Sequence, residues 1–340
     1  DKSILFVLED SGERHLAKFN RANQKIDRLV SGNVSVWGFS QHDSGDISFE
    51  MTMSHLPPEI FYLNGTNVKQ LTRVNEDLFK DIQLADVKNV VFMNEDLQEV
   101  EGFIFLPPNY QEKKRYPTIL KIHGGPVSQY DFSFNEEAQL LAANGYVVLA
   151  SNPRGSSGYG QDFSSALFAK WGIPDFVDVM AAVDYSISEG YSDPDKLGVG
   201  GWSYGGILTN YVITKTDRFK AAITGASEVN MEANYGHDHY QLEWEKELGL
   251  PWESKESWQK ISPWENVEKI VTPTLIMGGK EDWNVPIQNS EQLYQALKRR
   301  GIATKLIVYP DTSHWFSRPS FLKDYYERTL SWYEDFVLAD

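Results

Sequence analysis

Residues 200–206 read Gly-Gly-Trp-Ser-Tyr-Gly-Gly, with Ser203 at the centre of a Gly-x-Ser-x-Gly pattern. A largely apolar run at 196–199 precedes this stretch, and a run compatible with a helix follows it at 207–212. A strand, a sharp turn and a helix in this order form the setting of a nucleophile elbow, in which a serine stands at the top of a sheet. Because glycines on both sides keep side chains out of the turn, the chain can reverse there. An ordinary glycine-rich turn can have the same pattern. Whether Ser203 is a nucleophile therefore depends on whether the chain also carries a suitable acid and histidine.

A nucleophilic serine of this kind needs an acid and a histidine downstream, in the order Ser, Asp or Glu, His. Three of the seven histidines follow Ser203, and two of them leave little room for a strand that carries the acid. His314 has that room, because a strand predicted at 274–279 leads to Asp282 and a second one at 305–310 leads to His314. Parallel sheets place active sites just beyond such strand ends. We therefore predict a triad of Ser203, Asp282 and His314.

Composition restricts the class of protein. A chain of 340 residues with 41% hydrophobic residues can bury a large core and more than one domain. A net charge of −16 argues against nucleic acid or an anionic membrane as a partner. No run has the length of a transmembrane helix, and no signal peptide is recognisable. Because the chain begins at Asp1 within a strand pattern, we expect its N-terminus and any targeting signal to be missing, which leaves cytoplasm and periplasm open.

Residues 1–80 differ from the rest of the chain. Short alternating runs separated by polar turns predict seven antiparallel strands, at 4–8, 15–19, 26–30, 34–39, 47–51, 60–63 and 68–71. A faint repeat with a period in the low forties is typical of β-propeller blades. Since two blades cannot close a ring, we interpret residues 1–80 as the last blade and most of another from a longer propeller. A small β-subdomain that is complete in itself is the alternative.

From about residue 84 onward, predicted strands and helices alternate. Strands are expected at 87–93, 99–106, 118–122 and 146–150, and helices at 136–144, 175–189 and 289–300. Such alternation predicts a mostly parallel sheet wound on both sides. The prediction is an α/β-hydrolase domain over residues 81–340.

The loop after the strand at 118–122 reads His123-Gly-Gly-Pro. Acyl transfer places negative charge on the carbonyl oxygen of the substrate, and N–H groups aimed at that oxygen stabilise it. One such donor is the N–H of Tyr204, next to the nucleophile, and the second comes from a loop after an early strand. A tight turn would explain the glycines but not their position, so we favour an oxyanion loop.

These motifs together resemble the prolyl oligopeptidase family, above all its acylaminoacyl-peptidase and dipeptidyl-peptidase branches. The loop Asn-Pro-Arg-Gly-Ser-Ser-Gly-Tyr-Gly at 152–160 and the pattern Asp282-x-x-Val-Pro add to the resemblance. In that family a propeller caps an α/β-hydrolase domain, and substrates reach the serine through the cavity between them. The resemblance implies an exopeptidase acting on short peptides without a metal or cofactor, with Gly125 and Tyr204 as the oxyanion hole.

Two positions help to distinguish the branches of the prolyl oligopeptidase family. His123 stands where prolyl oligopeptidase and dipeptidyl peptidase IV relatives carry a tyrosine, and Asn284 stands where other branches carry an arginine that holds a substrate carbonyl. We predict substrate contacts for both residues. The family builds its S1 pocket between elbow and acid, where Tyr235, Tyr240 and Trp244 lie, although aromatic clusters of this kind are also typical of a core.

The remaining polar clusters receive plainer interpretations. His237 and His239 have no third ligand spaced for zinc, so we predict no metal site. The acidic run at 243–247 is expected to be a solvated helix face. Two other functions stay open, a carboxylesterase and a non-catalytic binding protein based on a propeller, and a homo-oligomer also stays open.

Overall fold

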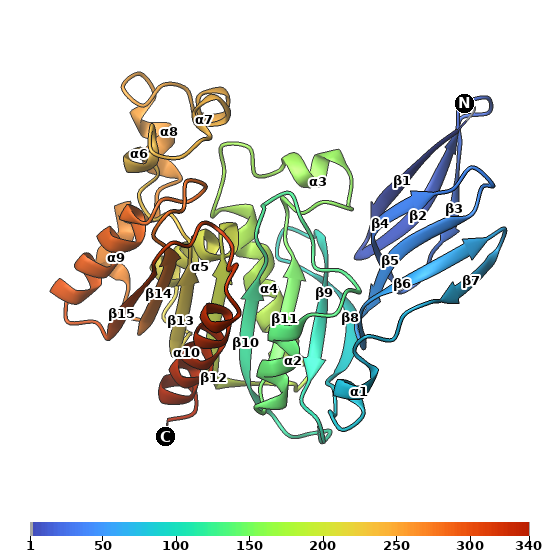
Figure 1. Ribbon diagram of the computed structural model, residues 1–340. Coiled ribbons are helices and arrows are strands. Elements are labelled where there is room, and N and C mark those ends of the chain that lie inside the picture. The colour runs from blue at the N-terminus through green and yellow to red at the C-terminus, as the bar shows by residue number, and fades with distance from the viewer. Residues whose placement is uncertain (1–2, 340) are drawn as a thin grey trace.

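The computed structural model describes residues 3–339 and contains two β-sheets (Figure 1). All seven runs expected in the N-terminal region are strands of the first sheet: β1 (Ser3–Asp10), β2 (Glu13–Asn20), β3 (Lys25–Val30), β4 (Ser35–Gln41), β5 (Ile47–Met53), β6 (Leu56–Asn64) and β7 (Asn67–Gln70). Strands β1–β3 form one antiparallel unit and β4–β7 another, and the single pair of Arg14 and Ser35 joins them. A short helix, α1 (Glu76–Phe79), leads to the second sheet.

The second sheet has eight strands in the order β15-β14-β13-β12-β10-β11-β9-β8. Their bounds are β8 (Asp86–Met93), β9 (Glu99–Leu106), β10 (Tyr116–Ile122), β11 (Val147–Asn152), β12 (Ser192–Trp202), β13 (Ala221–Gly225), β14 (Thr274–Gly279) and β15 (Thr304–Tyr309). Strands β8 and β9 are an antiparallel hairpin, and β9 runs antiparallel to β11. The six strands β10 to β15 are parallel to one another, so their carboxyl ends lie at one edge of the sheet.

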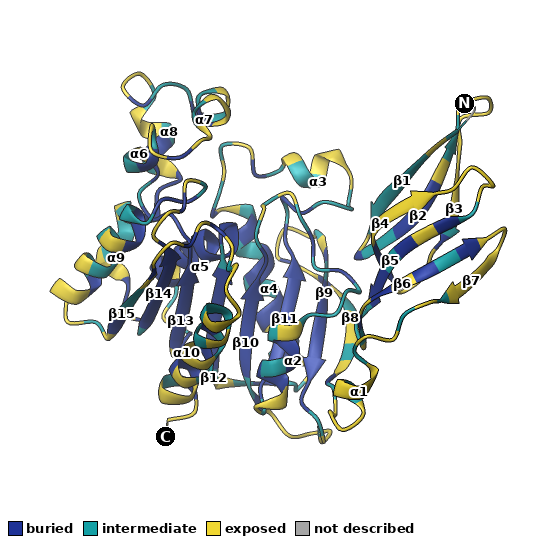
Figure 2. Cartoon of the chain, in the orientation of Figure 1, coloured by how far each residue is buried: buried dark blue, intermediate teal, exposed yellow. Residues whose placement is uncertain are grey.

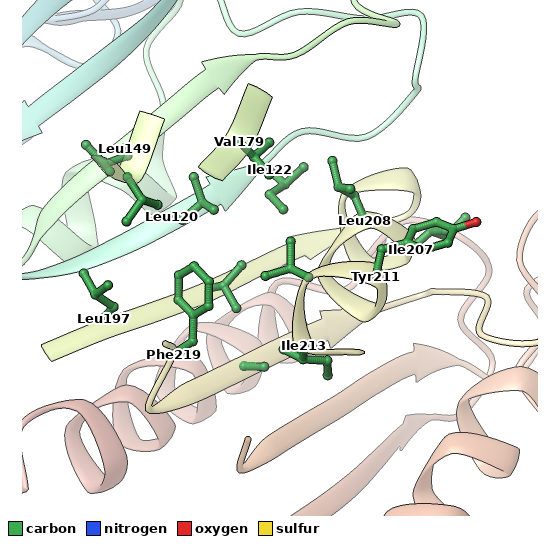
Figure 3. Packing of buried hydrophobic residues seen from close by; sticks show 14 of the residues in the cluster. Leu120, Ile122, Leu149, Val179, Leu197, Ile207, Leu208, Tyr211, Ile213 and Phe219 are labelled. Carbon is green, nitrogen blue, oxygen red and sulfur yellow. The ribbon is translucent and has the colours of Figure 1, made fainter. Parts of the chain in front are cut away.

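Helices cover both faces of this sheet, as the sequence predicts. Those on one face are α2 (Glu136–Ala143) and α10 (Pro319–Val337), and those on the other are α4 (Pro174–Ser188), α5 (Tyr204–Lys215) and α9 (Gln288–Arg299). Neighbouring strand residues alternate between the two faces, so Ile119 belongs to the cluster packed against α2 and α10. Leu120 belongs to the cluster packed against α4 and α5, where Figure 3 shows it with Val179 and Leu208. Because both faces of the inner strands β10, β11, β13 and β14 are buried, these strands are largely apolar runs and are dark in Figure 2, whereas the edge strand β8 is mostly exposed. The doubly wound α/β fold is confirmed.

Besides α1, five short helices connect these elements. They are α3 (Gln161–Ser165), α6 (Met231–Asn234), α7 (Gln241–Leu248), α8 (Lys255–Lys260) and the 3₁₀ helix η1 (Pro263–Lys269). Helices α6, α7 and α8 connect β13 to β14 and lie beyond the carboxyl edge of the sheet (Figure 1). Within residues 3–339, no helix combines the length and the apolar character that crossing a membrane requires.

The turn between β1 and β2 connects the first sheet to loops of the second. The Ser11 N–H donates to the Gly158 carbonyl at 3.1 Å, and the Phe132 N–H donates to the Gly12 carbonyl at 2.9 Å. The Gly12 N–H in turn donates to Oε1 of Gln129 at 3.2 Å. These hydrogen bonds place the first sheet beside the loops that follow β10 and β11.

Candidate active site

Ser203 lies on the sharp turn between β12 and α5. Its φ of 62° and ψ of −129° form a backbone conformation that L-amino acids rarely adopt, and its N–H donates to the Gly225 carbonyl at 2.9 Å. Strained conformations of this kind persist only where the surrounding structure holds them, and they cluster at functional sites. The side chain remains 9% exposed, at the edge where the parallel strands end.

The two glycines of the elbow allow this turn for a steric reason. A β-carbon at Gly201 would lie 2.5 Å from the carbonyl carbon of Gly205, and one at Gly205 would collide with the Ile122 carbonyl of β10. Helix α5 therefore begins directly against β10 and β12. Only glycine at both positions lets Ser203 occupy the N-terminal end of the helix.

Asp282 and His314 form a buried pair on the loops after β14 and β15. Nδ1 of His314 lies 2.7 Å from Oδ2 of Asp282, and the two side chains are 8% and 1% exposed. Oδ1 of Asp282 accepts the N–H groups of Asn284 and Val285 at 2.8 and 2.9 Å, which fixes the carboxylate. Because the carboxylate accepts the Nδ1 proton, Nε2 is left as the basic nitrogen of the ring.

His314 also contacts the elbow. The indole Nε1 of Trp202 donates to the His314 carbonyl at 3.0 Å, and the two rings lie 6.5 Å apart. Nε2 of His314 is buried and has no hydrogen-bond partner within residues 3–339. Catalytic hydrogen bonds often become short only when substrate binds, so the missing bond to Ser203 is compatible with a triad.

The loop after β10 passes beside the serine. A β-carbon at Gly124 would lie 3.5 Å from Cβ of Ser203, an ordinary van der Waals contact, so the loop lies directly against the serine. Gly125 has a φ of +133° and lines the same cavity as Ser203, and its N–H has no acceptor in the described part of the chain. Tyr204 is the first residue of α5, where the N–H has no acceptor within the helix. Two N–H groups beside one serine make an oxyanion hole geometrically possible.

His123 supports this loop from beneath. Its Nε2 lies 2.9 Å from Oγ of Ser156 and its Nδ1 lies 2.6 Å from the Gly124 carbonyl. The ring is 7% exposed and is not among the residues that line the cavity, and both of its nitrogens have partners in neighbouring loops. A substrate contact for His123 stays a prediction.

The burial of His123 predicts how the stability of the protein depends on pH. Burial lowers the pKa of His123 from 6.5 to about 4, so its contribution to stability is present above pH 6.5 and is lost as the pH falls toward 4. Between pH 7 and pH 5 the protein should lose about 2 kcal/mol of unfolding free energy through this group. A His123→Gln variant should lack that part of the decrease in denaturant titrations. His42→Gln, at an exposed position, serves as the control. If His123→Gln has the same pH dependence of stability as the wild type, the lowered pKa assigned to His123 is wrong.

A cavity of about 360 Å³ opens beside Ser203. Of the predicted pocket residues, Tyr240, Trp244 and Asn284 line it. Tyr235 does not, because its hydroxyl donates to Glu245 at 2.7 Å and its ring packs 5.6 Å from that of Trp258. This ring packs in the aromatic cluster that holds α6, α7 and α8 together, and a substrate contact for Tyr235 stays a prediction.

Acidic residues that the sequence patterns do not predict also line the cavity. Within the run expected to be a solvated face, Glu247 lines the cavity, and its Oε1 accepts the Ala169 N–H and Trp171 Nε1–H, each at 2.8 Å. Glu228, which is 2% exposed, also lines the cavity. Its position just after β13 was the signal that could have identified it, because functional side chains gather beyond such strand ends.

The His237-x-His239 motif lies apart from the cavity lining. The ring of His239 packs 4.5 Å from that of Tyr240. Among residues 3–339, no group of three or more His, Cys, Asp or Glu side chains is arranged to hold a metal ion.

Comparison with known proteins gives a consistent result. The model of the prolyl oligopeptidase family matches residues 132–338, which include Ser203, Asp282 and His314. The uncharacterized peptidase YuxL of Bacillus subtilis is 36% identical over 86% of this chain and 45% of its own length. Dipeptidyl-peptidase 5 of Porphyromonas endodontalis is 28% identical over 93% of this chain and 47% of its own length. The chain thus spans about half the length of the curated relatives it matches.

Solved structures agree with this match. An acylaminoacyl peptidase in complex with Z-Gly-Gly-Phe-chloromethyl ketone superimposes with a TM-score of 0.92 at 26% identity, over 99% of this chain and 55% of that one. A puromycin hydrolase shares the fold, with a TM-score of 0.86 at 19% identity over 98% of this chain and 52% of that one.

Proposed function

Because the chain belongs to the prolyl oligopeptidase family, we propose that it is a serine peptidase that hydrolyses short peptides through an acyl-enzyme. One observation carries this proposal. The buried pair of His314 and Asp282 lies at the same sheet edge as Ser203, which is held on a strained turn. A histidine oriented by a carboxylate beside a strained serine is the arrangement that activates a hydroxyl as a nucleophile.

The reaction follows from these three side chains. Nε2 of His314 takes the proton of Ser203 as Oγ attacks the peptide carbonyl carbon, and Asp282 stabilises the resulting imidazolium. The C–N bond then breaks, and the leaving amine takes the proton from His314. Water attacks the acyl-enzyme by the reverse sequence, which releases the acid and restores Ser203. Each step uses only groups of the chain and water.

The N–H groups of Gly125 and Tyr204 would stabilise the tetrahedral oxyanion. The hydroxyl of Tyr204 donates to Oδ2 of Asp175 at 2.7 Å, and the same oxygen accepts the Gly172 N–H at 3.1 Å. Burial raises the pKa of Asp175 to about 6. The carboxyl group of Asp175 thus holds Tyr204, whose N–H is one of the two proposed oxyanion donors.

Asn284 supports binding of an extended peptide. It lines the cavity, and its Oδ1 accepts a hydrogen bond from the hydroxyl of Tyr240. With Oδ1 engaged, the amide Nδ2 is left to donate to a substrate carbonyl. We assign Asn284 this role in an exopeptidase of acylaminoacyl- or dipeptidyl-peptidase type.

The first sheet fits a role as part of a cap. Its two antiparallel units correspond to the interpretation of residues 1–80 as propeller blades next to an α/β-hydrolase domain at 81–340. A cap beside the carboxyl edge would admit short peptides and keep folded proteins away from Ser203.

A panel of small substrates tests this function. It consists of acetyl-alanyl, alanyl-alanyl, glycyl-prolyl and succinyl-capped p-nitroanilides together with p-nitrophenyl acetate. We expect amide hydrolysis and covalent labelling of Ser203 by a fluorophosphonate. Cleavage of free-amine dipeptides alone would assign the protein to the dipeptidyl peptidases, and preference for acetylated residues would assign it to the acylaminoacyl peptidases. Turnover of the ester alone would replace the proposal with a carboxylesterase.

A further inference from the structure

The cavity beside Ser203 contains a buried carboxyl group that the proposed mechanism does not use. The Glu228 backbone is held by α5, because Nδ2 of Asn210 donates to the Glu228 carbonyl at 2.9 Å. Oε1 of Glu228 accepts a hydrogen bond from Asn234, whereas Oε2 is buried and has no partner within residues 3–339. The side chain is 2% exposed and lines the cavity. Oε2 is therefore an unpaired acceptor on a residue that lines the cavity.

The surroundings of Glu228 are negative. Three carboxyl groups line the cavity, those of Glu228, Glu243 and Glu247, and the described lining includes no Lys, Arg or His. Burial, and after it the neighbouring carboxyl groups of Asp238 and Asp282, raises the pKa of Glu228 well above its usual value, so its ionised form needs a cation nearby. The cavity therefore favours a positively charged group.

The walls of the cavity are apolar and aromatic. The rings of Trp171 and Trp244 lie 5.3 Å apart, and Ile207 and Val285 also line the cavity. Such walls suit the methylene stem of a long cationic side chain, and aromatic rings attract its charge. A cavity of this size accepts one such side chain.

An entering cation would supply the hydrogen bond that Oε2 lacks. A buried acceptor without a donor destabilises a protein. If an apolar side chain filled the cavity, Oε2 of Glu228 would still lack a donor. An ammonium or guanidinium group would instead form a charge-assisted hydrogen bond with Glu228. A buried cation likewise needs an opposite charge, so each group satisfies the other.

We propose that this cavity binds the side chain of the residue on the N-terminal side of the scissile bond, and that Glu228 selects lysine or arginine there. The inference rests on the proposed peptidase function and names the substrate class of the same site. Ser203 and Glu228 line one cavity, so the acyl group attached to the serine would direct its side chain toward the carboxyl.

The test compares acetyl-lysyl, acetyl-arginyl and acetyl-norleucyl p-nitroanilides, because norleucine matches the stem of lysine without its charge. We expect kcat/KM about 10- to 100-fold higher for the two cationic substrates than for norleucine. Glu228→Gln should remove this preference, so that the two cationic substrates and the norleucyl substrate are cleaved with similar kcat/KM. Glu243→Gln is the matched control, because its carboxylate lines the same cavity but is exposed to solvent, and the preference should survive there.

A second variant, Glu228→Met, keeps the length of the side chain and should favour norleucine over lysine. The rate of fluorophosphonate labelling of Ser203 checks in each variant that the site is folded. If wild-type protein is labelled and hydrolyses norleucine as fast as lysine, Glu228 does not select a cation and the peptidase function stands. Absence of both labelling and hydrolysis would overturn the peptidase function itself. A norleucyl p-nitroanilide with a free α-amino group completes the test. If it is cleaved as fast as the acetyl-lysyl substrate, and Glu228→Gln lowers that rate equally, the bound cation is the α-amino group and the assignment to a side chain is wrong.

Discussion

Ser203→Ala should lower kcat/KM for peptide anilides by about a millionfold and leave the fold intact. The reason is that alanine has no oxygen to attack the carbonyl, and only the oxyanion donors and substrate binding would remain. Alanine at a φ of 62° is no more strained than serine, so the elbow should persist. Rates should be measured with the best substrate of the panel, and thermal unfolding should show an unchanged transition.

The triad predicts non-additivity as well. His314→Ala should have an effect of similar size, and the double variant Ser203→Ala/His314→Ala should be no slower than either single variant. Ser186→Ala is the matched control, because this buried serine bonds to Ser192 at the opposite edge of the sheet. Two independent, multiplicative losses would show that Ser203 and His314 do not act as a unit.

Asp282→Asn should lower kcat by about ten thousandfold with little change in stability. The amide oxygen can still accept the N–H groups of Asn284 and Val285, so the loop keeps its shape. The amide nitrogen, however, would donate to Nδ1 of His314 and move the ring proton to Nε2. A protonated Nε2 cannot accept the proton of Ser203.

Asp311→Asn separates this effect from a general loss of charge. Asp311 is exposed, lies on the loop that carries His314 and pairs with Arg318 at 3.3 Å. Its replacement should change kcat by less than about twofold. A comparable loss in both variants would mean that Asp282 acts through its charge alone.

The scaffold could be predicted because it rests on local patterns. The strand expected at 274–279 is β14, and the strand expected at 305–310 is β15, displaced by one residue. Apolar runs of this length, bounded by glycine and polar turns, have few alternatives once both faces of the sheet are covered. Chain order and the strand ends then restrict the triad to one histidine and one acid.

The lining of the cavity could not be predicted in this way. His123 and Tyr235 are absent from the cavity lining, and their polar atoms bond to Ser156 and Glu245, which lie in other segments. Glu228 follows a strand like many loop residues, and no periodicity marks it as buried. Glu247 belongs to a run that is charged enough to be a solvated face, and only its contact with Trp171 reveals the buried side. Side-chain direction depends on tertiary contacts that no local pattern contains.

The hydrogen bonds of the β1–β2 turn have a mechanical consequence. Gln129, which accepts the Gly12 N–H, lies four residues after Gly125 in the loop that follows β10. A movement of the first sheet away from the second would break these hydrogen bonds or displace the Gln129 segment. Because Gly125 lies on the same loop, the position of the first sheet is mechanically coupled to the backbone beside Ser203.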